Sequence, residues 1–416
     1  MRHDACQVAV SPDRGAAAGV PVYRHRNLQV VFAVTLVAVL AVSSITPALP
    51  KIARELGVSP ARIGWLISAF TLPGVVLTPI FGLIADRAGR KTVLVPSLLL
   101  FGAAGTACAL THDFQTLLLL RVLQGVGGAS LGALNLTIIS DLYSGPVRTE
   151  AMGYNASVLS VGTASYPAIG GALALLGWNY PFLLSLLAFP VALLALKGLP
   201  AAYPTANTSL SAYVARVGRA LATPAIAGMM FATVATFIML FGAYLVFLPV
   251  LAAGSFGVSS LVIGFIMSSA SIMTAITSYR LGYLARRFGQ VRLVRTGFVL
   301  YGVAMIGFPL ARETWQLVLP ASLFGVGAAL SIPTILSMLA DYAPEDQRGA
   351  FMSIIGMLLR LGQTLGPILM GAVVSVWGLH AAFGAGAAIA FLTLIVVIVT
   401  LPNTSHHHPN EAGELP

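Results

Sequence analysis

Long apolar runs separated by short polar segments follow one another along most of the chain. A helix needs about 20 mostly apolar residues to cross a bilayer, and it satisfies its own backbone hydrogen bonds there. The period-two alternation of a transmembrane barrel strand is absent from the sequence. The pattern therefore predicts an all-α membrane protein with twelve transmembrane helices. The runs lie at residues 28–49, 63–85, 92–110, 114–143, 151–176, 180–199, 226–251, 259–281, 291–310, 314–342, 349–376 and 380–401.

The segments outside these runs are short and polar, so they leave no room for a soluble catalytic domain. Residues 1–27 carry Pro12 and Gly15 where a signal peptide would need an apolar core, and we expect a cytoplasmic tail there. We expect residues 402–416 to be a second cytoplasmic tail. Residues 200–225, which contain Pro, Thr, Asn and Ser, are predicted to be a cytoplasmic linker.

Composition agrees with lipid as the solvent of this chain. Hydrophobic residues make up 57% and charged residues 9% of the sequence, against roughly 25% charged residues in a soluble domain. Of the 23 Lys and Arg residues, seventeen fall in loops on one side of the predicted helices, four on the other side, and two inside helices. Because Lys and Arg concentrate in cytoplasmic loops, we expect a multi-pass protein of the bacterial inner membrane with both termini cytoplasmic. This topology accounts for the net charge of +10 without a nucleic-acid partner.

A shift of 200 positions brings the first half of the chain into register with the second. Asp, Arg and Pro match under this one ungapped shift as well as Gly. The chain is therefore predicted to form two six-helix halves, 28–199 and 226–401, as parallel pseudo-repeats with a substrate site between them near the midplane. The matching pairs include Gly82 and Gly282, Gly89 and Gly289, Gly125 and Gly325, Asp141 and Asp341, Arg148 and Arg348, Gly162 and Gly362, Pro167 and Pro367, and Gly171 and Gly371.

No residue set with the spacing of a catalytic centre, metal site or cofactor site is recognisable. Cys6 and Cys108 lie on segments that should not meet, which excludes a disulfide framework. His406, His407 and His408 are predicted to belong to a polar tail rather than to a metal site. We therefore expect no enzyme activity, no metal and no cofactor.

Two motifs in the first half are typical of one family. Between helices 2 and 3 the chain reads Gly82-Leu-Ile-Ala-Asp86-Arg87-Ala-Gly89-Arg90-Lys91. Helix 4 carries Arg121-x-x-Gln124-Gly125-x-Gly127-Gly128. The first resembles the G-x-[LI]-A-D-R-x-G-R-K signature of the major facilitator superfamily, and the second resembles that family's R-x-x-Q-G-x-G motif.

A third motif resembles the drug/proton antiporter branch of that family. Helix 5 reads Gly162-x-x-x-Tyr166-Pro167-x-x-Gly170-Gly171, similar to G-x-x-x-G-P-x-x-G-G. It departs at Tyr166, where the family has glycine. Helix 11 carries a related Gly362-x-x-x-Gly366-Pro367-x-x-x-Gly371, and the resemblance extends from helix 1 to helix 12.

The resemblance implies alternating access by rocking of the two halves, with helices 5 and 11 at the interface that opens and closes. Asp86 would bond the start of helix 11 near Gly349, where the helix dipole favours an anion, and Arg90 would pair with Asp141. These contacts would hold the outward-open state, so cytoplasmic opening would break them. The residues with this expected gating role are Gly82, Asp86, Arg87, Gly89, Arg90, Lys91, Asp141, Gly162, Pro167, Gly170, Gly171, Gly362, Gly366, Pro367 and Gly371.

Arg121 and Arg360 fall at mid-depth in helices 4 and 11. An arginine there costs several kcal/mol unless it faces water or a partner, so both are predicted to line the cavity. The alternative is that either one snorkels or bonds backbone carbonyls. The other candidates for substrate or coupling contacts are Gln124, Asn135, Gln363, Phe70, Tyr154, Tyr166, Phe241, Tyr244 and Phe324.

None of the thirteen carboxylates falls at mid-membrane, and His380 lies at the edge of helix 12. With two arginines and no acid, the cavity should be electropositive. The expected function is multidrug-type efflux of small amphipathic compounds by a monomer, with H+ as the coupling ion. The alternatives are an exporter of anionic metabolites, lipids or siderophore-like molecules that uses Arg121 and Arg360, and a membrane receptor without transport.

Overall fold

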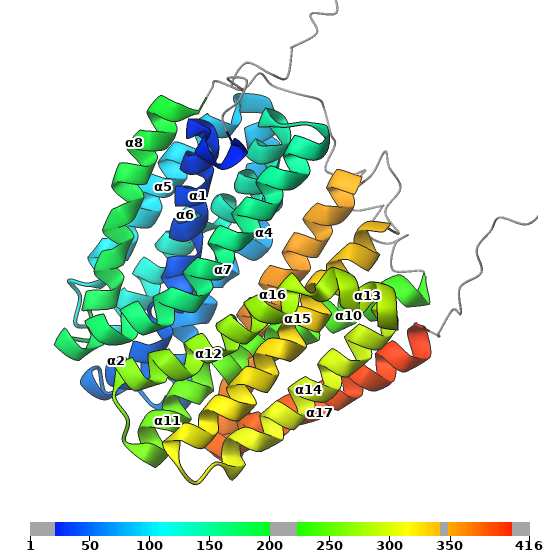
Figure 1. Ribbon diagram of the computed structural model, residues 1–416. Coiled ribbons are helices and arrows are strands. Elements are labelled where there is room, and N and C mark those ends of the chain that lie inside the picture. Colours follow the sequence, from blue (N-terminus) through cyan, green and yellow to red (C-terminus); the bar gives the residue numbers. More distant parts are fainter. Residues whose placement is uncertain (1–20, 200–222, 342–347, 402–416) are drawn as a thin grey trace, which may run out of the picture.

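The computed structural model describes residues 21–199, 223–341 and 348–401, except for the side chains of residues 348–353. The described part is helical and contains no strand. Twelve of its helices are long and apolar enough to cross a membrane, which confirms the predicted number of spans. Figure 1 shows them as two groups, the first six spans in blue to green and the last six in green to red.

The first six spans run alternately up and down one group. Their elements are η1 (Val22–Arg24), α1 (Arg26–Ser43), η2 (Thr46–Ala48), α2 (Leu49–Glu55), α3 (Pro60–Ile63), α4 (Trp65–Ala88), α5 (Arg90–Cys108), α6 (Phe114–Leu142), α7 (Gly145–Leu176), η3 (Tyr180–Leu187) and α8 (Ala188–Gly198).

The last six spans form the second group. Their elements are α10 (Pro224–Ile238), the π-helical η4 (Met239–Phe247), α11 (Leu248–Phe256), α12 (Ser260–Tyr279), α13 (Leu281–Phe288), α14 (Gln290–Leu310), η5 (Thr314–Leu317), α15 (Val318–Asp341), α16 (Arg348–Trp377) and α17 (Leu379–Thr400).

Helix bounds depart from the apolar runs where proline or charge interrupts the pattern. The first span breaks between α1 and η2, where Pro47 and Pro50 lack the N–H that a continuous helix uses, and it then continues to Glu55. Helix α7 begins at Gly145. The apolar run begins only at residue 151, because the first turns of the helix are exposed and largely polar. An apolar run therefore marks the part of a helix that lies in lipid and omits the turns beyond it.

The internal repeat reappears in the packing of each group. A Cβ added to Gly125 of α6 would overlap the backbone carbonyl of Phe70 in α4. A Cβ added to Gly325 of α15 would overlap the backbone carbonyl of Ala270 in α12. The two pairs are separated by the same shift of 200 positions that relates the sequences. Glycine at these positions lets equivalent helices approach closely in both groups.

The two groups meet mainly through α4 with α16 and α7 with α12. A Cβ added to Gly64 would lie 2.9 Å from Cβ of Pro367, and one added to Gly264 would overlap the backbone of Pro167. These contacts exchange under the same shift, as expected for a pseudo-twofold axis between parallel repeats. We name these contacts the seal, which also contains the pairs Gly171 with Ser260 and Gly371 with Ala61.

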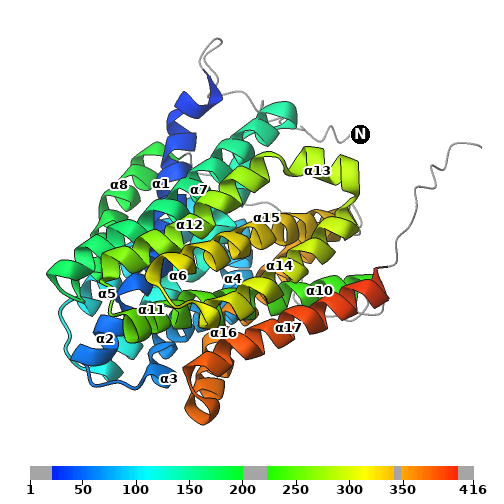
Figure 2. The same cartoon turned by 60° about the horizontal axis from the view of Figure 1, so that its bottom comes forward.

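The seal lies at one end of the bundle, and the opposite end, at Gly89 and Gly289, carries the basic loops and is named the basic end. Toward the basic end, a Cβ added to Gly82 of α4 or Gly356 of α16 would meet no atom of the described side chains within 4 Å. In Figures 1 and 2, α7 and α12 lie side by side. The structure is therefore closed at the seal and open toward the basic end.

Candidate functional site

Arg90 holds two carboxylates at the basic end. Its Nε donates to Oδ2 of Asp141 at 3.1 Å, and its Nη1 donates to Oδ1 of Asp86. Gly89, with a φ of +93°, turns the chain between α4 and α5 so that Arg90 begins α5 beside both acids. We name Asp86, Arg90 and Asp141 the latch. The expected ion pair is present, and its gating role stays a prediction.

The expectation that cytoplasmic opening breaks the Arg90–Asp141 pair stays a prediction. The pair is intact in a structure that is open at the basic end. All latch residues belong to the first six spans, and rigid separation of two helix groups leaves the distances inside each group unchanged. Only a bond from Asp86 to the start of α16 would join the groups, and its expected partner Gly349 lies among the residues whose side chains are outside the described part.

Arg121 does not line the opening, which corrects the sequence prediction. Its side chain is fully buried, and its Nε donates to the carbonyl of Leu66 at 3.1 Å. Its Nη1 donates to Oε1 of Gln124 at 2.7 Å, and Gln124 in turn donates to Oγ of Ser185 at 3.0 Å. The guanidinium also lies 4.5 Å from the ring centroid of Phe70. The alternative that this arginine bonds a backbone carbonyl is therefore the one the structure supports, and Arg121 and Gln124 brace α4 and α6 inside the first group.

The predicted aromatic wall is also absent from the opening. Phe70 is buried under Arg121, and Tyr244 and Phe324 are buried in the second group, where their rings stack at 4.5 Å. Tyr166 is buried as well, and Tyr154 forms an edge contact with Tyr23 at the basic end. The buried rings among these candidates pack inside the helix groups, where a ring adds a large packing area. Phe241 is buried too, and it stacks on the partly exposed Phe237 at 6.0 Å.

The glycines of helices 5 and 11 serve two different contacts. Gly171 and Gly371 belong to the seal between the groups. Gly170 faces the backbone of Ser44 within the first group, while Gly362 and Gly366 face the seventh span within the second. The last pair lies against the π-helical segment, where the backbone of Gly242 approaches that of Gly366.

Arg360 lies where α16 meets the first group. Its Cδ is 3.1 Å from the position of a Cβ on Gly74, and its Nη2 is 4.0 Å from that of a Cβ on Gly132. Its Nη1 donates to Oε1 of Gln363 at 3.2 Å. Arg360 and Gln363 are partly exposed, and within the described ranges no carboxylate pairs with this guanidinium. Arg360 is therefore the charged side chain of the sequence prediction that reaches the space between the groups.

The closed part of the interface begins one turn beyond Arg360. The hydroxyl of Ser68 in α4 donates to the backbone carbonyl of Thr364 at 2.8 Å, and the Thr364 hydroxyl bonds that of Thr71 at 2.9 Å. On the other side of the axis, Ser271 donates to the carbonyl of Thr163 at 3.0 Å. Arg360 consequently marks the inner limit of the opening.

The first group presents a small polar cluster near this limit. Asn135 of α6 donates to the hydroxyl of Thr35 in α1, and that hydroxyl donates to Oδ1 of Asn155 in α7 at 2.6 Å. All three side chains are buried, and Oδ1 of Asn135 has no partner among the described residues. The sequence prediction included Asn135 and missed Thr35 and Asn155, although all three polar residues interrupt otherwise apolar runs.

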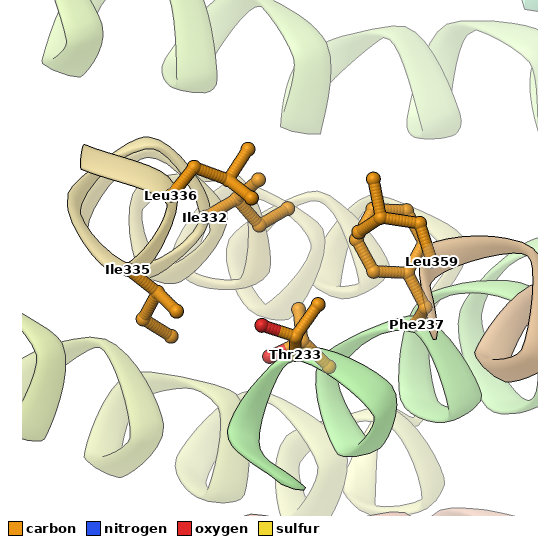
Figure 3. Close-up of a pocket in the computed structure, with 7 residues that line it drawn as sticks. Thr233, Phe237, Ile332, Ile335, Leu336 and Leu359 are labelled. Atoms are coloured by element: carbon orange, nitrogen blue, oxygen red, sulfur yellow. The ribbon is translucent and has the colours of Figure 1, made fainter. Parts of the chain in front are cut away.

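The second group presents an apolar groove at the same level. Figure 3 shows it between α10 and α15, with Leu359 of α16 at its edge. The space between the lining side chains is about 180 Å³ including its open mouth. The lining residues are Thr233, Thr236, Phe237, Ile332, Ile335, Leu336 and Leu359, and none of them was predicted from the sequence.

Comparison with known proteins agrees with this architecture. The profile of the family described as Major Facilitator Superfamily matches residues 31–252 and, a second time, residues 229–416. The chain belongs to the major facilitator superfamily. It is a multi-pass membrane transporter and not an enzyme. The two matches overlap at residues 229–252 and together cover residues 31–416.

Relatives within the superfamily are distant in sequence and similar in fold. Multidrug transporter protein MdtP of Bacillus subtilis is 25% identical over 388 residues, covering 79% of this chain and 71% of the relative. Quinolone resistance protein NorA of Staphylococcus aureus is 22% identical, covering 81% of this chain and 87% of the relative. The solved nucleoside transporter NupG superposes with a TM-score of 0.73 at 16% identity, covering 91% of this chain and 99% of that one.

Proposed function

We propose that this chain exports small amphipathic compounds by alternating access between two halves, residues 28–199 and 226–401, joined by a linker at residues 200–225. The observation that carries the proposal is the combination of a seal at one end with an opening at the other. A transporter that rocks about a central site needs this geometry and its reverse. The printed names of MdtP and NorA, a multidrug transporter and a quinolone resistance protein, support efflux as the direction.

We place the basic end in the cytoplasm of a bacterial cell, with the protein as a monomer in the inner membrane. The excess of Lys and Arg in the loops at that end supports this orientation. Residues 1–27 and 402–416 are then cytoplasmic tails. In this orientation the structure corresponds to the state that takes up substrate from the cytoplasm.

We propose H+ as the coupling ion, with the latch as the place where protonation acts. Arg90 is shared by two carboxylates, so protonation of Asp86 or Asp141 removes half of its anionic partners. The latch lies at the basic end, which this proposal places in the cytoplasm. An imposed pH gradient tests this part separately from transport itself.

The alternative of an exporter of anionic compounds gains support from Arg360. This guanidinium lies at the inner limit of the opening without a carboxylate partner among the described residues. A cation in this position favours an anionic ligand. Arg121, which the alternative also invoked, is buried and plays no part in it.

Counterflow in proteoliposomes tests the proposal. Purified protein is reconstituted and loaded with each member of a panel of neutral, anionic and cationic amphiphiles, with and without a pH gradient. We expect exchange of at least one amphiphile class, and faster net flux when the gradient is imposed. Saturable binding without exchange by any compound would contradict transport and favour a receptor. An exchange rate that does not change when the pH gradient is imposed would contradict proton coupling and leave transport itself unaffected.

A further inference from the structure

We propose that the opening contains a bipartite site for amphipathic anions, in which Arg360 binds the anionic group and the groove of the second half holds the apolar part. This inference rests on the proposed transport function and names the substrate class that the site accepts. Both subsites lie on the second half, and Gly74 and Gly132 of the first half lie beside the anionic one.

The anionic subsite follows from the surroundings of Arg360. Gly74 and Gly132 of the first half lie beside Arg360 and carry no side chain there. Gln363 takes one N–H, and the others have no carboxylate partner within the described ranges. A carboxylate, sulfonate or phosphate group in that space would accept two N–H bonds from a planar guanidinium.

Neighbouring residues of α16 belong to the two subsites. Leu359 lines the groove and directly precedes Arg360, so their Cα atoms are about 3.8 Å apart. Leu359 lies one residue closer to the basic end than Arg360. A bound amphiphile would therefore place its anionic group at the inner limit of the opening and its apolar part in the groove toward the basic end.

Comparison of the two halves shows that the walls differ at equivalent positions. Ile332 and Ile335 of the groove correspond, under the shift of 200, to Gly132 and Asn135. Gly132 is exposed beside Arg360, and Asn135 belongs to the buried polar cluster. By the same shift, Ile332 occupies the equivalent place on the opposite wall. At these two positions the second half presents isoleucine where the first half presents glycine and asparagine.

Calorimetric titration with linear alkanesulfonates, from butanesulfonate to octanesulfonate, tests the site on the full protein in nanodiscs. Sulfonates stay ionised at all working pH values, and empty nanodiscs correct for partitioning into lipid. Each added methylene group should tighten binding about fourfold as long as it enters the groove. Alkyltrimethylammonium ions of equal chain length should bind weakly, because the guanidinium repels them.

Two kinds of variant separate the subsites. Arg360→Gln should weaken every sulfonate by the same factor, about ten- to a hundredfold, and leave the chain-length dependence unchanged. Ile332→Asn and Leu359→Asn should flatten the chain-length dependence and leave butanesulfonate binding nearly unchanged. Both groove residues are partly exposed, so the folded state tolerates the amide, and thermal unfolding checks that it does. Arg312→Gln and Leu310→Asn are matched controls at exposed positions of the far end.

Equal binding of cations and sulfonates, or no effect of Arg360→Gln, would overturn the anionic subsite. A chain-length dependence that survives both groove variants would place the apolar part elsewhere. Sulfonate binding that follows the expected pattern without counterflow would refute the proposed transport and leave the site intact. Counterflow rates that change neither with Arg360→Gln nor with the chain length of the compound would refute the site and leave the proposed transport intact.

Discussion

The substitution Gly264→Val should shift the transporter away from the state seen in the structure. Gly264 lies in the seal, where an added Cβ would overlap the backbone of Pro167 in α7. A backbone group cannot turn aside as a flexible side chain can, so α12 and α7 must separate. The state that is open at the opposite end already separates them and accommodates the valine. The substitution therefore destabilises one access state and leaves the other unaffected.

The magnitude follows from the cost of overpacking. Forcing extra methyl groups into a close-packed contact costs about 1–3 kcal/mol. Since that cost falls on one state alone, the population ratio of the two states changes by about 5- to 150-fold. Gly254→Val is the matched control, because no atom lies within 4 Å of a Cβ added there. It introduces the same side chain at the far end without touching the seal.

Chemical labelling from outside the membrane measures this shift. Ser268 is buried on the face of α12 that carries Gly264, and its hydroxyl has no hydrogen-bond partner among the described residues, so Ser268→Cys changes little else. In a background with Cys6 and Cys108 replaced, a membrane-impermeant maleimide should label this cysteine slowly. Adding Gly264→Val should raise the labelling rate by the population factor, and adding Gly254→Val should not. Equal labelling rates for both glycine variants would refute the assignment of the seal.

The other predictions concern the latch, the buried arginine and one helix cap. Asp86→Asn and Asp141→Asn should each lower counterflow while the protein stays inserted, because each removes one charged partner of Arg90. Normal flux in both variants would show that the latch does not control the change between access states. Arg121→Ala should lower stability by about 3 kcal/mol or more, because it leaves a void and unpaired polar groups, and it should not alter charge selectivity; thermal unfolding and counterflow of anions check both. Hydrogen bonds from the backbone and side chain of Thr116 lower the pKa of Asp113 in the folded protein. This carboxylate therefore stabilises the N-terminus of α6 fully at pH values above its unfolded pKa of roughly 3.9, and the stabilisation is lost as the pH falls through the folded-state pKa. The melting temperature of Asp113→Ala should therefore lie below that of the wild type at pH 7 and converge with it in acid, and a gap that persists in acid would contradict this.

The number of spans and the internal repeat could be predicted from the sequence because both follow from local composition. Each span needs its own apolar length, and the repeat is a match of residue types that needs no coordinates. The break at Pro47 and the polar first turns of α7 blur helix bounds without changing the count. The π-helical segment of the seventh span has no comparable signal, since it arises where Gly242 and Gly366 bring two backbones together.

Placement of the candidate site could be predicted only in part, because helical spacing gives the face of a residue and not what covers that face. Arg121 and Arg360 have equivalent signals in the sequence, as lone arginines at mid-depth. Arg121 is covered by Phe70 and bonds the backbone carbonyl of Leu66, whereas Arg360 contacts two glycines of the opposite half. The difference lies in residues that are distant in sequence and adjacent in space.

The two halves agree where the transporter closes and differ where a ligand would bind. Gly64, Pro167 and Gly171 of the seal have the same residue types at Gly264, Pro367 and Gly371. This equality has a mechanical reason, since α4–α16 and α7–α12 flank one axis and must close together if the halves move as rigid groups. The ligand walls carry no such constraint, and there the shift of 200 pairs glycine with isoleucine, asparagine with isoleucine, and Ser160 with Arg360. A symmetric seal is thus compatible with an asymmetric ligand site. Sequence divergence within one half can change which compounds bind without changing how the two halves move.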